Sequence, residues 1–273
     1  MFSFNLSKTV LAGILLGFLV VSYANAQAAR ATPKLKILIP AYFDPGKLWD
    51  QLINITSQGK VSITAIVGIF INDSPTLSIQ PSYVKTLAKF QQAGGKVLGY
   101  VHTCSAVKCP YAPYQEITIS AALDEAKKYL DWYSVDGIFI DEMSYYVKDL
   151  PYYVNLSSAL RHLTTTKSLI LVGNPGTNTN VQYLQTVDTL VTYESGVNQF
   201  LSTSVESWAF SHSPSAQASI VYGVSSPAKF PALISRALAR NDGYIYLTSA
   251  GLPNPYGDLG KFFPQFVAAV EQS

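Results

Sequence analysis

Eight short apolar runs alternate with amphipathic stretches along this chain, and this alternation constrains its fold more than any other feature. The runs span Lys36–Tyr42, Ile63–Ile69, Lys96–His102, Gly137–Asp141, Ser168–Gly173, Thr189–Glu194, Ala218–Gly223 and Gly243–Thr248. Several are apolar at consecutive positions, as in Ile138-Phe139-Ile140, which is typical of strands buried on both faces of a parallel sheet. The sequence therefore predicts parallel strands joined by helical crossovers.

Helical spacing of apolar residues appears between the runs. The predicted helices are Pro81–Ala93, Ile119–Trp132, Phe230–Ala239 and Phe263–Val270, with a less regular one around Val197–Thr203. In the first of them Val84, Leu87 and Phe90 recur every three residues, as expected for the buried face of a helix.

Eight strand–helix units in the 247 residues that follow the first 26 match the usual size of a (β/α)8 TIM barrel. The alternative is an open, doubly wound sheet, but the glycine-rich G-x-G-x-x-G turn does not follow the first run. Since no low-complexity stretch divides the chain, we predict one α/β barrel domain over residues 34–273.

Residues 1–26 have the pattern of a secretory signal peptide. Lys8 is the only charge, Val10–Val21 is apolar apart from glycine, and Ala24-Asn25-Ala26 supplies a small-residue cleavage site. A membrane-spanning helix is the alternative, but the apolar run is too short and lacks a basic flank. We therefore expect removal of the leader, a short linker over residues 27–33, and a secreted, extracellular protein that is not held at a membrane.

Two further features suit an oxidising compartment. Cys104 and Cys109 are the only cysteines and are predicted to form a local disulfide. Asn54, Asn72 and Asn155 each begin an Asn-x-Ser/Thr sequon and are candidate glycosylation sites.

The charge balance narrows the partners and cofactors. Nineteen basic and 17 acidic residues leave a net charge of +2, too little for a nucleic-acid-binding surface. The three histidines are scattered, and two cysteines supply too few ligands for structural zinc. We expect no metal, no cofactor and no nucleic acid, and a monomer.

Acidic residues end two of the predicted strands. Asp141 and Glu142 close the fourth apolar run, and Glu194 closes the sixth. TIM-barrel active sites lie at the carboxyl ends of the strands, and glycoside hydrolysis needs a pair of carboxyl groups. Alternatively, each acid caps a helix or pairs with a basic residue. Adjacent residues point to opposite faces of a regular strand, so periodicity leaves open which of Asp141 and Glu142 enters the barrel mouth.

Other strand ends carry groups suited to binding a sugar. Tyr42, Tyr100 and Tyr193 are candidates for stacking on sugar rings, with packing as the alternative. His102 is a candidate cleft residue. Asn174 is a candidate hydrogen-bonding partner of the substrate, or else shapes the turn that follows it.

The sequence also resembles the spherulin-4 (spherulation-specific family 4) proteins, secreted barrel proteins grouped with microbial glycoside hydrolases. Its most specific part is Asp136-Gly137-Ile138-Phe139-Ile140-Asp141-Glu142. The other stretches that carry it are Ile37–Tyr42 with Trp49, Ile63–Val67, Lys96–Val101, Asn174–Thr177, Tyr193-Glu194 and Asn254–Tyr256. The chain departs from the family pattern over Gly68–Pro75 and over Cys104–Cys109, two loops expected to border the cleft.

The resemblance implies an endo-acting glycosidase that acts on α-1,4-linked galactosamine or N-acetylgalactosamine polymers. The family's essential acids match Asp141, Glu142 and Glu194. By analogy with related barrels, Asp141 is the expected nucleophile, Glu194 the general acid/base, and Glu142 a supporting or alternative acid. The other function compatible with the same barrel is that of a non-catalytic carbohydrate-binding or developmental coat protein.

Overall fold

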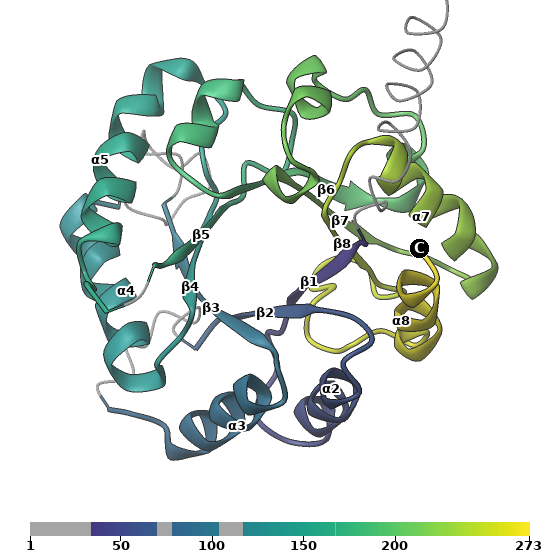
Figure 1. The fold of residues 1–273 in the computed structure, drawn as a ribbon, viewed down its shortest axis with the longest axis horizontal. Coiled ribbons are helices and arrows are strands. Elements are labelled where there is room, and N and C mark those ends of the chain that lie inside the picture. Colours follow the sequence, from purple (N-terminus) through teal and green to yellow (C-terminus); the bar gives the residue numbers. More distant parts are fainter. Residues whose placement is uncertain (1–33, 70–77, 104–116, 167) are drawn as a thin grey trace, which may run out of the picture. The chain divides into compact units, whose positions relative to one another are not determined.

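The strands of this chain close into a ring that is surrounded by helices (Figure 1). The structure is a computed structural model, and it describes residues 34–69, 78–103, 117–166 and 168–273. Within this part of the chain, Lys34–Ser273 forms one compact unit. The predicted leader, the linker, Asn72 and the two cysteines lie outside the described residues.

Eight parallel strands form the ring. They are β1 (Lys36–Pro40), β2 (Ile63–Val67), β3 (Lys96–His102), β4 (Gly137–Asp141), β5 (Ile170–Gly173), β6 (Thr189–Gly196), β7 (Gln217–Tyr222) and β8 (Tyr244–Leu247). Each strand pairs with the next one in the sequence, and β8 pairs with β1 through Tyr244 and Lys36. This closure confirms the (β/α)8 barrel and excludes the open sheet.

The helices cover the outside of the ring unevenly. They are α2 (Lys47–Ser57), α3 (Pro81–Gln92), α4 (Ile119–Tyr133), α5 (Leu150–Arg161), α6 (Val197–Phe200), α7 (Phe230–Ala239) and α8 (Phe263–Glu271). The connection from β5 to β6 contains a 3₁₀ turn, Val181–Gln185, in place of an α-helix. The predicted helix at Val197–Thr203 is a single turn, Val197–Phe200, after which the backbone N–H groups of Ser202 and Thr203 both bond to the carbonyl of Gln199.

The buried face of α3 differs from the one expected. Val84 is 37% exposed, whereas Tyr83, Leu87 and Phe90 face the core. The period of 3.6 residues explains the change, because spacings of four and three follow one side of a helix better than a strict three.

Two glycines allow close contacts between neighbouring elements of the barrel. A Cβ at Gly99 of β3 would lie 2.3 Å from the ring of Tyr129 on α4, and one at Gly137 of β4 would lie 2.0 Å from the carbonyl oxygen of Ile170 on β5. Larger residues at these points would separate the elements that carry the strand ends.

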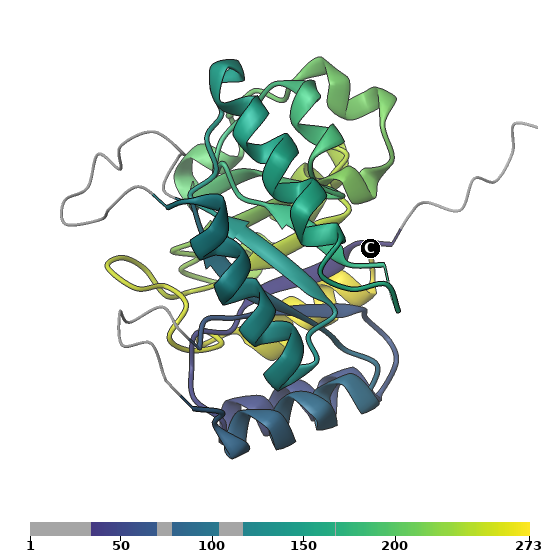
Figure 2. The ribbon, with the colours of Figure 1, turned by 90° about the vertical axis from the view of Figure 1, so that its left-hand side faces the viewer.

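The segment between β8 and α8 projects at one end of the barrel (yellow in Figure 2). This is the end at which the strands finish, since β1 begins at the opposite end. In the described part of the chain, none of the helices has the length and apolarity needed to cross a membrane.

Replacing Gly137 by alanine tests the contact between β4 and β5. The added Cβ would lie 2.0 Å from the carbonyl oxygen of Ile170, a backbone atom that moves only if the strands separate. We expect the free energy of unfolding to fall by about 1–3 kcal/mol in urea denaturation. Gly251→Ala is the matched control, because a Cβ there meets no described atom within 4 Å. Equal stability of the two variants would contradict the clash.

Candidate active site

Three neighbouring strands bring two carboxyl groups and one amide together at the carboxyl end of the barrel. Asp141 is the last residue of β4, Asn174 directly follows β5, and Glu194 lies near the end of β6. The Nδ2 of Asn174 donates to Asp141 Oδ1 at 2.6 Å and to Glu194 Oε2 at 2.5 Å. Two bonds of these lengths from one nitrogen keep the two carboxylate oxygens within about 5.1 Å of each other, the sum of both lengths. The strand ends that the sequence pointed to therefore meet in one site.

A β-bulge turns Glu194 into this site. Val191 pairs with Ala218 of β7, but after a shift in register Glu194 pairs with Ile220. Positions 218 and 220 share one face of their strand, so Val191 and Glu194 also share a face although they are three residues apart. Without the extra residue, Tyr193 would take the inward position of Glu194.

The bulge explains why Tyr193 does not line the cleft, contrary to the prediction. Its ring is buried against Phe200, with centroids 5.0 Å apart, and its hydroxyl donates to the carbonyl of Gly196. Tyr193 belongs to the packing outside the barrel, next to the guanidinium of Arg240.

A buried polar network that the sequence did not predict lies behind the bulge. Arg240 is fully buried, and its NH2 group donates to the hydroxyl of Thr192, the residue at the register shift. Asp242 accepts hydrogen bonds from Ser219 and Gln217 and forms an ion pair with Arg240. These contacts hold β6 and β7 in the shifted register that orients Glu194.

Asn174 takes the second of its two alternative roles, shaping the turn, and its amide nitrogen also bonds to the two acids. Its Oδ1 accepts from the backbone N–H of Gly176 at 2.9 Å, so it shapes the turn. Its Nδ2 is directed at the two carboxyl groups, so the amide positions the acids where the prediction gave it a bond to the substrate.

The two carboxyl groups share an environment that favours retention of a proton. Burial, followed by the negative charge of Asp141, raises the pKa of Glu194 to about 6. Burial also raises the pKa of Asp141, while hydrogen bonds from Tyr100, Asn174 and the backbone of Glu142 oppose this shift. Since two charges this close repel each other, the pair titrates as a unit.

Glu142 leaves the regular strand geometry, so Asp141 is the acid that enters the barrel mouth. The backbone of Glu142 has a φ of 51°, in the left-handed region that costs a non-glycine residue about 1–2 kcal/mol. Burial and the charge of Asp141 raise its pKa, and the charge of His102 opposes them. His102 pairs with Asp141 in the ladder between β3 and β4, which places it beside the two acids.

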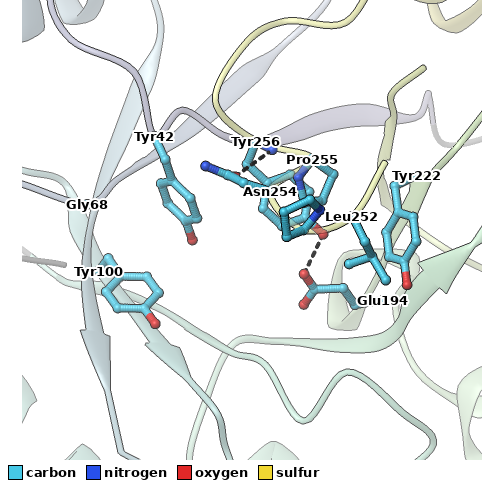
Figure 3. Close-up of a pocket in the computed structure, with 10 residues that line it drawn as sticks. Tyr42, Gly68, Tyr100, Glu194, Tyr222, Leu252, Asn254, Pro255 and Tyr256 are labelled. Atoms are coloured by element: carbon cyan, nitrogen blue, oxygen red, sulfur yellow. Dashed lines mark hydrogen bonds between the residues drawn. The ribbon is translucent and has the colours of Figure 1, made fainter. Parts of the chain in front are cut away.

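A cavity of about 500 Å³ opens beside Glu194 (Figure 3). Two of its tyrosines were predicted from the sequence: Tyr42 and Tyr100 lie at the strand ends of β1 and β3, with their rings edge to face at a centroid distance of 5.7 Å. The segment after β8 supplies Tyr256, whose hydroxyl donates to Glu194 Oε1 at 2.5 Å. Tyr256 was not singled out as a site residue, although it belongs to the Asn254-Pro255-Tyr256 stretch.

The site offers acids and aromatic rings but no cluster of metal ligands. Across residues 34–69, 78–103, 117–166 and 168–273, no group of three or more His, Cys, Asp or Glu side chains is placed to hold a metal ion.

Comparison with known proteins identifies the family. The model of the spherulation-specific family 4 proteins (Spherulin4) matches residues 36–270. The chain belongs to this family. Spherulin-4 of Physarum polycephalum is 31% identical over 183 residues, which make up 66% of this chain and 51% of that protein. The chain thus spans about half the length of this curated relative.

Solved structures share the barrel. Sph3 of Aspergillus clavatus, in complex with GalNAc, matches with a TM-score of 0.72 and 21% identity over 88% of this chain and 98% of that one. An active domain of a chitinase from Pyrococcus furiosus matches with a TM-score of 0.53 and 14% identity over 90% and 98%. At these identities the likeness concerns the fold, which this Spherulin4 chain has in common with glycoside hydrolases.

Tyr256→Phe tests the electrostatic coupling within the site. The hydrogen bond from Tyr256 lowers the pKa of Glu194, so its loss should raise that pKa further above its present value of about 6. A pH titration followed by NMR of carboxyl-labelled glutamate measures the shift. Tyr222→Phe is the control, because Tyr222 lines the same cavity and has no hydrogen bond to Glu194. An unchanged or lowered pKa in Tyr256→Phe would contradict the assigned contact.

Proposed function

We propose that this protein is a secreted, endo-acting glycoside hydrolase that cleaves α-1,4-linked galactosamine or N-acetylgalactosamine polysaccharides. The observation that carries the proposal is the pair formed by Asp141 and Glu194, held by one amide at the mouth of a tyrosine-lined cavity. Membership of the Spherulin4 family and the GalNAc bound to the similar barrel of Sph3 support the class of substrate.

The separation of the acids favours a retaining mechanism. Retaining glycosidases place their carboxyl groups roughly 5–5.5 Å apart, whereas inverting ones leave roughly 6.5–9.5 Å to admit a water molecule. The shared bonds to Asn174 Nδ2 limit the nearest oxygens to about 5.1 Å, the sum of both lengths. This upper limit favours direct attack on the sugar by one carboxylate over the wider spacing that admits a water molecule.

Asp141 is assigned as the nucleophile and Glu194 as the general acid/base. Three donors, from Tyr100, Asn174 and the backbone of Glu142, support the anionic form of Asp141. That negative charge helps to keep a proton on Glu194. Glu194 then protonates the leaving oxygen while Asp141 attacks the anomeric carbon to form a glycosyl-enzyme. Ionised Glu194 next takes a proton from the water that hydrolyses it.

Glu142 is assigned a supporting role beside Asp141. Its backbone N–H donates to the Asp141 carboxylate, and its own charge acts on Tyr100. Tyr42 and Tyr100 line the cavity, and His102 lies beside Asp141; all three are assigned to contacts with the sugar ring.

Export is part of the proposal. The leader-like residues 1–26 support it, as do the cysteine pair Cys104 and Cys109 and the three sequons. Asn54 on α2 and Asn155 on α5 are both exposed, which suits attached glycans.

Incubation of the purified protein with galactosaminogalactan, and with chitin for comparison, tests the reaction. We expect oligosaccharides to be released from galactosaminogalactan, with the anomeric configuration retained in the first product seen by NMR. Asp141→Asn and Glu194→Gln should each reduce release by at least 10³-fold while the melting temperature stays within a few degrees. Release that persists in both variants would overturn the mechanism. Binding of the polymer without release by the unmodified protein would instead support a carbohydrate-binding or coat protein.

The pH dependence of kcat/KM tests the division of roles. Glu194 has to be protonated to act as the acid, so activity should fall as the pH rises through about 6, where this group loses its proton. Asp141 has to be ionised to attack. Because its pKa is raised above the ordinary value of 3.8, activity on the acidic side of the profile should begin to fall at a pH above 3.8. The expected profile is a bell with a mildly acidic optimum. Activity that is constant from pH 5 to pH 9 would contradict the assignment.

A further inference from the structure

A second, shallower cavity of about 370 Å³ lies over the segments that follow β4, β5 and β6. Its lining includes Tyr145, Tyr146, Asn178, Thr179, Asn180 and Glu206. The cavity beside Glu194 is lined by the segments after β1, β2 and β8 and by strand residues of β3, β6 and β7. The two cavities therefore lie over different loops, and the strands β4 and β6, which carry Asp141 and Glu194, lead into the loops of the second.

Two exposed tyrosines form one side of the second cavity. Tyr145 is 45% and Tyr146 is 53% exposed, and their ring centroids are 4.3 Å apart. The hydroxyl of Tyr145 donates to that of Tyr146 at 3.0 Å. Exposed tyrosine pairs offer apolar ring surface with a polar edge, a combination that suits the faces and hydroxyl groups of sugars.

The backbone beneath these rings is held in place. The hydroxyl of Tyr183 donates to the carbonyl of Tyr146 at 2.7 Å, and the N–H of Tyr146 donates to Ser144 Oγ. Ser144 is itself buried and bonded to Asp149 at 2.6 Å. A surface that is ordered before a ligand arrives loses less conformational entropy on binding.

The opposite wall supplies polar groups that the described protein atoms leave unpaired. Thr179 is 4% exposed, and its Oγ1 has no hydrogen-bond partner among the described residues; the same holds for Asn178 Oδ1. The amide nitrogen of Asn180 and the exposed carboxylate of Glu206 likewise have no partner in the described part of the chain. Buried polar groups of folded proteins are nearly always hydrogen-bonded, so the unpaired oxygens of Asn178 and Thr179 point to a further partner, and the exposed Asn180 and Glu206 can bond to the hydroxyl groups of a sugar.

The second cavity is continuous in sequence with the candidate active site. Tyr145 follows Asp141 by four residues in the segment after β4. On the other wall, Gly176 accepts the backbone hydrogen bond of Glu194 at 3.0 Å and lies two residues before Asn178. A chain of sugars that passes the acids would reach these walls without crossing a strand.

The charges near the tyrosines favour a neutral sugar. The ammonium group of Lys148 lies 5.4 Å from the centroid of the Tyr146 ring, so this ring already has a cation–π partner. At the surface of the region Lys148 supplies one positive charge and Glu206 one negative charge, while Asp149 is buried and bonded to Ser144. A neutral hexose or an N-acetylated hexosamine therefore fits better than a second ammonium group.

We propose that Tyr145 and Tyr146, with Asn178, Asn180 and Glu206, form a distal subsite for neutral or N-acetylated sugar units of the polysaccharide. The inference rests on the proposed glycosidase function and deepens it. The subsite lets the enzyme hold a long chain whose cleaved bond lies several units away, as endo-acting cleavage requires.

The test compares long and short oligosaccharides in Tyr145→Ala/Tyr146→Ala. N-acetylated galactosaminogalactan fragments of graded length are used both for hydrolysis and for calorimetric binding to the Asp141→Asn protein. We expect the paired substitution to raise KM and Kd for long fragments roughly tenfold and to leave short fragments unchanged. Tyr145→Phe/Tyr146→Phe keeps the rings and should retain most of the affinity. Phe210→Ala removes an exposed aromatic residue outside the cavity and serves as the control.

Three results would overturn the subsite. They are an unchanged KM for long fragments, an equal loss for short and long fragments, and an equal effect of Phe210→Ala. The unmodified protein could bind long fragments without cleaving them, and Tyr145→Ala/Tyr146→Ala could abolish this binding. That result would support the subsite and contradict the glycosidase proposal. If the unmodified protein neither cleaves nor binds any fragment, both proposals fail.

Discussion

The hydrogen bonds that join β8 to β1 close the sheet, and the rest of the structure depends on this closure. In a closed ring of parallel strands all carboxyl ends meet at one mouth, so residues far apart in the sequence become neighbours. Asp141 and Glu194 are 53 positions apart, yet a single amide bonds to both. The loop after β8 brings Tyr256 to the same place.

Within that mouth, hydrogen bonds to the two acids offset part of the cost of burying them. Burial raises the pKa of both acids, and donors from Asn174, Tyr100 and Tyr256 offset part of this effect. Behind β6, the buried Arg240 and Asp242 support the bulge at Thr192 that orients Glu194. Charged groups this deeply buried are tolerated because each is paired, and removing one partner would leave the other costly to bury.

The barrel was predictable because its signal is local and repeated. Consecutive apolar residues such as Ile138-Phe139-Ile140 identify strands covered on both faces, and β3 and β4 begin and end where the sequence placed them. The acids were predictable because a charged residue directly after such a run is costly unless it faces a cleft. The length of α6 and the buried face of α3 were mispredicted, since the point where a helix ends and the face that it buries depend on neighbouring segments.

From the sequence alone follow the number and direction of the strands, the barrel class and the acids at the ends of β4 and β6. Each of these depends on residues close together along the chain. Only the tertiary structure decided that Asp141 enters the mouth while Glu142 adopts a left-handed backbone, and that Tyr193 turns away while Tyr256 reaches Glu194. These outcomes depend on a one-residue shift between β6 and β7 and on a loop whose path is set by the closed ring. A shift of one residue exchanges the two faces of a strand, and residue periodicity carries no information about the register between distant strands.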